Sequence, residues 1–104
     1  MNLRSSDSLA LVTSAATTVD VDVAYNDEGG GATGNGSNTA TAITTATTTT
    51  IQVAPTGAFV RRCIKSISIC NKDSSSNTVT VRLVDTGGSD GTAATVQLYK
   101  VTLA

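Results

Sequence analysis

Apolar and polar residues alternate along residues 18–25, where three valines and a tyrosine share one parity and two aspartates share the other. A period of two is typical of a β-strand with one buried side and one solvent-facing side. The same alternation recurs at residues 78–85. The residues that we predict to face the core of these two strands are Val19, Val21, Val23, Tyr25, Val79, Val81 and Leu83.

Residues 59–70 form the longest predicted strand, but the period slips within it. Its aliphatic residues change parity halfway, with Val60 and Ile64 on one parity and Ile67 and Ile69 on the other. Because one extra residue in a strand reverses the side to which later side chains point, a β-bulge near Lys65-Ser66 would bring all four to the core side. The turn residues at 71–77 then predict a hairpin with the 78–85 strand.

Threonine-rich and valine-rich runs between turn signals predict the remaining strands. Threonine occurs 19 times and suits a half-buried pleated surface, whereas the helix former Glu occurs once. The first Thr tracts end at Ala54-Pro55, because proline cannot donate to a β-ladder, and Thr56-Gly57 predicts a turn. A turn at 86–91 continues an antiparallel meander into the last strand. These runs cover residues 39–46, 47–53 and 94–103.

The organisation along the chain indicates a single domain that spans residues 1–104. Recurrent turn signals predict an all-β fold, either an antiparallel β-sandwich or a small barrel. Residues 26–38 contain five glycines and little apolar surface, which predicts a long flexible Gly-rich loop. We interpret residues 1–8 as an N-terminal arm.

Composition excludes several kinds of chemistry. The chain has no histidine, so it lacks the commonest general base and transition-metal ligand, and we expect no enzyme, no cofactor and no metal site. A net charge of -1 offers no attractive field for nucleic acid or for a membrane surface, and we expect neither partner. The apolar run at residues 9–12 is too short for a signal peptide or a membrane span.

The two cysteines lie in one predicted strand, seven positions apart. Seven extended residues span about 23 Å, whereas the Cα atoms of a disulfide lie within about 7 Å of each other. Cys63 and Cys70 therefore cannot bridge each other there. We predict two small half-buried residues, with an intermolecular bridge and a reactive thiol as the alternatives.

Arg61, Arg62 and Lys65 form the basic cluster of the chain, and we consider both a solvated strand face and a contact with an acidic partner surface. The last predicted strand continues to the C-terminal residues, so we expect it at a sheet edge that recruits another chain. Val101 and Leu103 share one parity on this strand. These five residues are the candidate partner contacts.

Acidic residues occur in two patterns that could carry chemistry. Residues 85–91 have the composition of a calcium loop, but Asp90 stands where an EF-hand needs glycine, so we predict a hairpin turn. Asp20 and Asp22 share a strand face, but two carboxylates alone do not make a glycosidase. We expect this pair to protect a sheet edge or to meet the basic cluster.

Five segments that together cover much of the chain form a pattern of strands and Thr tracts: residues 6–16, 19–25, 42–51, 62–71 and 77–81. This pattern resembles a group of small structural proteins of tailed bacteriophages. The resemblance implies a β-sandwich module on a capsid or tail surface. Members of that group continue past the segment equivalent to 100–104 with a Gly-Glu turn and a further strand that this sequence lacks, which bears on whether the sheet closes within one subunit.

The resemblance and the small, aromatic-poor core lead to one hypothesis, a non-enzymatic phage virion structural protein. Its most specific form is a head decoration or cement protein bound to the capsid lattice, located in the virion and assembled in the host cytoplasm. The expected partners are the major capsid protein or other virion proteins, and further copies of the chain in a homo-oligomer such as a trimer. The alternatives are a tail or head-to-tail connector component and, more distantly, a secreted carbohydrate-binding β-sandwich, which would need exposed aromatic platforms.

Overall fold

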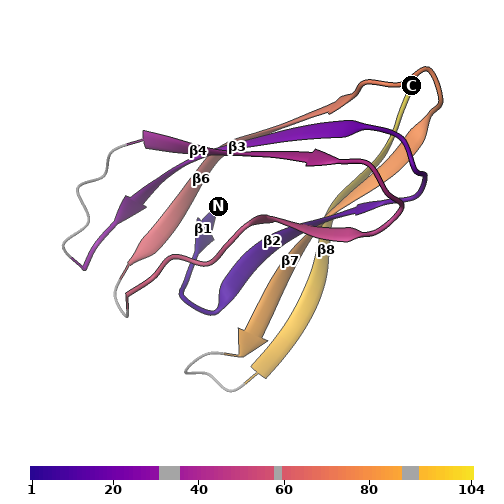
Figure 1. Cartoon of the computed structure of the whole chain (residues 1–104). Coiled ribbons are helices and arrows are strands. Elements are labelled where there is room, and N and C mark those ends of the chain that lie inside the picture. Colours follow the sequence, from indigo (N-terminus) through magenta and orange to yellow (C-terminus); the bar gives the residue numbers. More distant parts are fainter. Residues whose placement is uncertain (31–35, 58–59, 88–91) are drawn as a thin grey trace.

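The computed structural model describes residues 1–30, 36–57, 60–87 and 92–104, and the structural statements below concern these residues. They form an all-β fold in which two antiparallel four-stranded sheets pack face to face (Figure 1). The predicted fold class is confirmed, and of the two predicted forms the structure has the sandwich. The described residues contain no helix.

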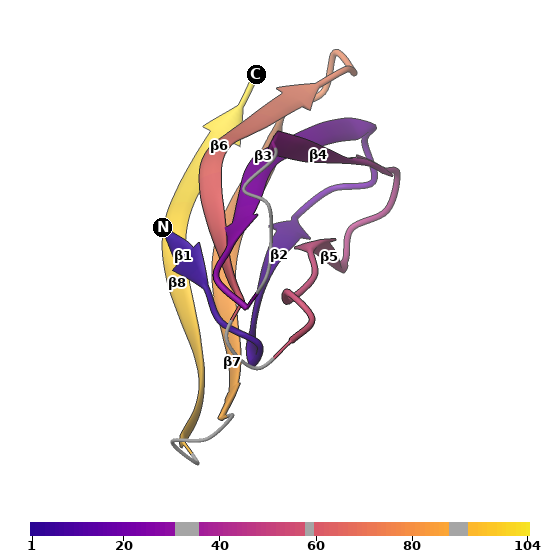
Figure 2. The ribbon, with the colours of Figure 1, turned by 90° about the vertical axis from the view of Figure 1, so that its left-hand side faces the viewer.

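Two sheets, A and B, make up the sandwich. Sheet A contains, in spatial order, β1 (Asn2–Leu3), β6 (Arg61–Asn71), β3 (Val19–Glu28) and β4 (Gly36–Ile43). Sheet B contains, in spatial order, β5 (Thr48–Gln52), β2 (Asp7–Thr13), β7 (Asn77–Gly87) and β8 (Thr92–Leu103). Figure 2 shows β1 and β8 along one side of the sandwich and β4 and β5 along the other.

The alternating strands build the core as predicted. Val19, Val21 and Val23 of β3 are at most 2% exposed. Val79 and Val81 of β7 are also buried, and together these two strands supply the centre of the core. Tyr25 and Leu83 are partly buried against it. The remaining buried members of the core cluster are Leu3, Leu9, Leu11, Ile43, Ile51 and Ile64.

The predicted bulge in β6 is confirmed. The register between β3 and β6 passes from Ala24 opposite Ser66 to Tyr25 opposite Ile64, so Lys65 is the extra residue. Ile64 is 9% exposed, and the later isoleucines, Ile67 and Ile69, are partly buried against the core. The bulge therefore lets both halves of an 11-residue strand turn their aliphatic side chains to the same face.

The predicted hairpin between residues 59–70 and 78–85 is wrong. β6 belongs to sheet A and β7 to sheet B, so the connection at residues 72–76 crosses from one sheet to the other. The two strands meet face to face through their inward side chains instead of lying side by side. β7 and β8 do form a hairpin, as predicted for the end of the chain.

Residues 1–8, which we interpreted as an arm, belong to the sandwich. β1 pairs with β6, and Leu3 has no exposed surface. Asp7 and Ser8 begin β2, a central strand of sheet B that the alternation did not reveal. Its residues 9–11 are all buried, so this strand has no solvent-facing side along that stretch and shows no period of two.

The Gly-rich connection is shorter than the predicted range of 26–38. β3 continues to Glu28 and β4 begins at Gly36, so both ends of the predicted loop are paired strand. Gly29 and Gly30 leave β3 with positive φ angles of 83° and 55°, a conformation that glycine adopts readily. Residues 31–35, where the loop prediction also applies, lie outside the described residues.

Candidate assembly surface

Strand β8 forms an open edge of sheet B. It is 12 residues long, and no described residue pairs with its outer side. Lys100 is its only charged residue and it has no proline, although natural proteins usually protect exposed edges with charges, prolines or short strands. Among the other described edges, β1 has two residues, β5 has five, and β4 consists mainly of small polar residues, glycine and alanine. Among the four outermost strands, β8 is therefore the least protected against contact with another chain.

The inner face of β8 carries apolar side chains that no strand covers. Tyr99 lies opposite Val81 and Val96 lies opposite Leu83, so all four belong to the core-facing side of sheet B. Val81 is 4% exposed, whereas Tyr99 is 58% and Val96 is 48% exposed. The difference arises because β1, the strand of sheet A on this side, is only two residues long.

A second bulge adds Leu98 to the same surface. The β7–β8 register passes from Val81 opposite Tyr99 to Arg82 opposite Gln97, which makes Leu98 the extra residue. Leu98 is 39% exposed. The large hydrophobic residues exposed in the described part of the chain are Met1, Val53, Val96, Leu98 and Tyr99. Four of these five therefore lie on β8 or beside it.

A groove of about 350 Å³ lies between β6 and β8. The residues that line it are Met1, Ile64, Lys65, Ser66, Ile67, Ile69, Val81, Leu98 and Tyr99. Its wall is mainly apolar, the ammonium of Lys65 is the one charged side chain among the lining residues, and none of them carries a carboxylate. We refer to this feature as the β6–β8 groove.

One wall of the β6–β8 groove is a free strand edge. β1 pairs with residues 62 and 63 of β6, and the amide of Ile64 then donates a hydrogen bond to the carbonyl of Met1 over 2.7 Å. Beyond that point, no described strand pairs with residues 65–70 on this side of β6. The backbone groups of this stretch that point away from β3 are therefore available to an added strand.

The candidate partner contacts predicted from the sequence lie in different environments. Lys65 lines the β6–β8 groove, and Arg61 is exposed at the start of β6. Val101 and Leu103 are partly buried against the core. The side chains of these two residues, which share one parity on β8, thus point into the sandwich. The exposed apolar surface lies earlier on the same strand, at residues 96–99.

Arg62, another of the candidate contacts, directs its side chain to partners within the chain. Its side chain is 11% exposed, and its Nε and Nη2 donate hydrogen bonds to the two carboxylate oxygens of Asp27 over 2.8 and 2.9 Å. Its Nη1 donates to the carbonyl of Val53 over 3.0 Å. Because β6 and Asp27 belong to sheet A and Val53 follows β5 of sheet B, Arg62 ties the two sheets together.

The ion pair changes the acid-base behaviour of both groups. The hydrogen bonds from Arg62 lower the pKa of the Asp27 carboxyl below its ordinary value, against the opposing effect of burial. The same bonds raise the pKa of the Arg62 guanidinium. Both ions are therefore favoured in the folded state.

Asp20 and Asp22 do not have the roles that we expected. β3 lies between β6 and β4, so the pair is not on a sheet edge, and neither carboxylate meets an arginine in the described residues. Asp20 forms an ion pair of 3.3 Å with Lys72, and Asp22 accepts a 2.8 Å hydrogen bond from Asn38. They border a shallow hollow of about 510 Å³ on sheet A, beside residues such as Ala40 and Ser68 of neighbouring strands.

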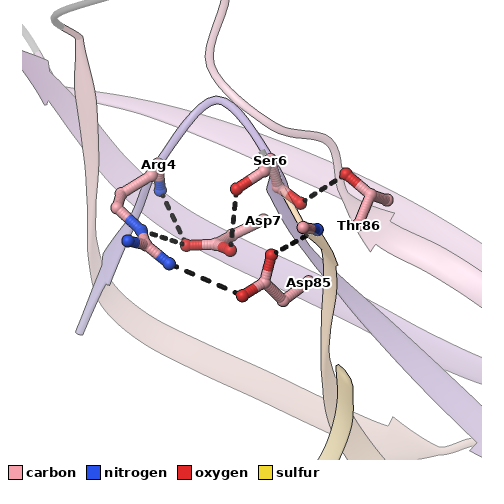
Figure 3. A network of polar contacts seen from close by, with 6 residues as sticks. Arg4, Ser6, Asp7, Asp85 and Thr86 are labelled. Atoms are coloured by element: carbon pink, nitrogen blue, oxygen red, sulfur yellow. Dashed lines mark hydrogen bonds and ion pairs between the residues drawn. The ribbon is translucent and has the colours of Figure 1, made fainter. Parts of the chain in front are cut away.

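A polar network fixes the entry into β2 (Figure 3). Asp7 lies opposite Asp85 in the β2–β7 register, and Arg4 contacts both carboxylates, at 3.3 Å and 3.5 Å. Ser6 and Thr86 extend the network, since the amide of Thr86 donates to the Ser6 carbonyl over 2.9 Å. The arginine lies between two carboxylates that would otherwise repel each other across the strand pair.

Asp85 also supports the hairpin interpretation of residues 85–91. Its Oδ1 accepts a 2.9 Å hydrogen bond from the amide of Gly87, whose φ of 103° is in the left-handed region. This contact stabilises the start of a turn. Residues 88–91, which complete the predicted turn, lie outside the described residues.

The cysteines are unbridged, as predicted. Cys63 is half-buried, as predicted, whereas Cys70 is exposed, against the prediction, because it lies opposite Asp20 on the solvent-facing side of sheet A; both are free thiols. In the described part of the chain, no three His, Cys, Asp or Glu side chains gather in a way that could hold a metal ion. Within the same residues, no helix is long and apolar enough to cross a membrane.

Comparison with known proteins found no significant match to a family model, to a well-characterised protein or to a solved structure.

Proposed function

We propose that this protein is a non-enzymatic structural protein of a tailed-phage virion, and most specifically a head decoration protein bound to the capsid lattice. The proposal combines the resemblance of the sequence pattern to such proteins with an open, apolar side of the sandwich. The observation that carries it is the exposure of Tyr99 and Val96 on the core-facing side of β8. Neighbouring exposed apolar side chains of this kind are typical of a surface that contacts another protein.

The energetic argument follows from exposed area. Complete burial of a large apolar side chain contributes about 1.5–3 kcal/mol. Tyr99 is 58% exposed and Met1 is 54% exposed, so about half of that stabilisation is still to be gained at each. With Val96 and Leu98 included, a partner that covers this side gains on the order of 3–5 kcal/mol from apolar burial. Docking in many copies then stabilises a small, aromatic-poor sandwich through its neighbours.

The chemistry of the described surfaces favours a binding role over a catalytic one. The β6–β8 groove is lined by apolar residues, one serine and Lys65, and the whole sequence has no histidine to act as a general base. For a carbohydrate-binding role, the described rings are poorly placed, because the Tyr25 ring is covered by Arg62. Tyr99 alone would have to serve as the platform.

Quantitative mass spectrometry of purified virions, separated into heads and tails, tests the proposal. We expect the protein in the head fraction at a fixed ratio to the major capsid protein. Recovery in the tail fraction alone would replace the decoration role with that of a tail or connector component. Absence from both fractions, with the protein in the culture supernatant or the host cytoplasm, would overturn the virion role.

A further inference from the structure

We propose that the β6–β8 groove accepts an extended strand of another protein, one in which apolar residues alternate with acidic residues. The strand would add to the free edge of β6 at residues 65–70 and place its apolar side chains on Leu98 and Tyr99. This inference deepens the proposed function by naming the docking site and the chemistry of the partner. It relies on that function only for the partner's location in the virion.

The geometry of the groove fits a strand. Its one wall is an unpaired strand edge, which supplies backbone hydrogen bonds, and its other wall is the uncovered inner face of β8. Alternate side chains of an added strand point to one face. Those pointing inward would cover Tyr99 and Ile67, and would complete the layer of sheet A that β1 occupies for only two residues.

The charge of the groove selects the partner. Among the residues that line it, the one charged side chain is the ammonium of Lys65, and none of them carries a carboxylate. A second copy that offered its own β8 would bring another cation, Lys100, and no acid. The segment of this chain that alternates valine with aspartate is β3, which is already paired on both sides. Complementarity therefore favours an acidic strand from a different protein.

The test uses synthetic peptides and the full chain. The probe is a blocked peptide of about nine residues, a typical strand length, in which Val or Ile alternates with Glu, and its binding is followed by fluorescence anisotropy. A matched peptide with Lys in place of Glu should bind about tenfold more weakly at low salt. A peptide with N-methylated amides on the side facing β6 should also lose about tenfold, because it cannot form the ladder.

Protein variants locate the site. Leu98→Glu and Tyr99→Glu should each weaken binding of the Glu peptide about tenfold, whereas Val53→Glu should leave it unchanged. Val53 is the matched control because it is 62% exposed and does not line the groove. When the peptide is bound, hydrogen exchange should show new protection of those amides in residues 65–70 that point to the open edge of β6 and not to β3.

Four results would overturn the inference. The first two are no binding of the Glu peptide at millimolar concentration and equal binding of the Glu and Lys peptides. The third is equal binding of the Glu peptide by Leu98→Glu and by the wild type. The fourth is dimerisation of the wild type that Leu98→Glu abolishes, because a second copy would then be the occupant. Peptide binding with these controls, together with absence of the protein from virions, would keep the inference and reject the proposed function. Presence of the protein in heads without peptide binding would keep the proposed function and reject the inference.

Discussion

The guanidinium of Arg62 lies over the ring of Tyr25, with its Cζ 4.4 Å from the ring centroid. The same guanidinium is held by both oxygens of Asp27 and by the carbonyl of Val53. A planar fork with several donors can satisfy all of these contacts at once, which a lysine could not. The contact therefore covers the Tyr25 ring, which packs against the core, and links the two sheets at the same end of the sandwich.

Replacement of Arg62 should destabilise the fold much more than replacement of its neighbour. Arg62→Ala removes the ring contact and leaves Asp27 without its cation, so we expect the free energy of unfolding to fall by about 2–3 kcal/mol. Arg61→Ala is the matched control, because Arg61 is exposed, and it should change stability by less than about 0.5 kcal/mol. Urea denaturation measures the free energy of unfolding of both variants. Similar values for the two variants would show that the contact does not hold the sheets together.

The ion pair also predicts how stability depends on pH. The pKa of Asp27 is lowered in the folded state by its hydrogen bonds with Arg62, so it lies below the unfolded value of about 3.9. The contribution of the pair is therefore complete above about pH 5 and is lost as the pH falls through the folded-state pKa. Asp27→Asn should be less stable than the wild type at pH 7 and should approach it near pH 2. Denaturation series at both pH values give this comparison, and a constant difference between the two proteins would refute the assignment.

Asn77 should be the most sensitive polar residue in the described part of the chain. It is 1% exposed, and its Oδ1 accepts hydrogen bonds from the amides of Ser14 and Ala15. Its Nδ2 donates to the carbonyl of Ala15 and to the hydroxyl of Thr17. Asn77→Ala removes the partner of the Ala15 amide and carbonyl and the buried hydrogen bond to Thr17, so we expect a loss of about 2–3 kcal/mol in thermal or urea unfolding. Asn38→Ala, at an exposed position, is the control, and an equal loss there would contradict this role.

Gly57 occupies a position that other residues fit poorly. Its φ is 105°, and a Cβ built on it would lie 3.1 Å from Cγ2 of Val60. Gly57→Ala should therefore lower the free energy of unfolding by about 1 kcal/mol or more. Gly36→Ala provides a comparison, because a Cβ at that position would meet nothing within 4 Å. A neutral effect at Gly57 would mean that the turn relaxes without cost.

The sequence predicts the strands best where one face of the strand is buried and the other is exposed to solvent. Val19, Val21 and Val23 alternate with polar residues, and their burial follows directly. The parity slip in β6 also located the bulge at Lys65. By contrast, β2 has buried residues on both faces, so its sequence carries no period.

The pairing between strands that are distant in the sequence was harder to predict. A short connection such as residues 72–76, within the predicted turn at 71–77, can close a hairpin or cross between sheets, and turn residues alone do not distinguish the two. The register of β8 with β7 was also not predicted from the sequence. A bulge at Leu98 places Val96, Tyr99 and Val101 on one face although their parities differ. The parity change between Val96 and Tyr99 is the signal that could have identified this exposed surface.

The exposed residues of β8 should contribute little to the stability of the isolated chain. Leu98→Ser and Tyr99→Ser should each lower the free energy of unfolding by about 1 kcal/mol, because a large part of each side chain, 39% and 58%, is already exposed. Leu11→Ala, at a position with no exposed surface, should cost about 2–5 kcal/mol. Urea denaturation compares the three variants. A large loss at Leu98 or Tyr99 would show that these side chains belong to the monomer core.

A density map of the assembled virion tests most directly whether the protein assembles through the β6–β8 groove. We predict that a strand of a neighbouring chain lies along residues 65–70 of β6 and covers Leu98 and Tyr99. A map in which these two side chains face solvent, while the protein is held through the outer face of sheet A, would contradict this assignment of the docking surface.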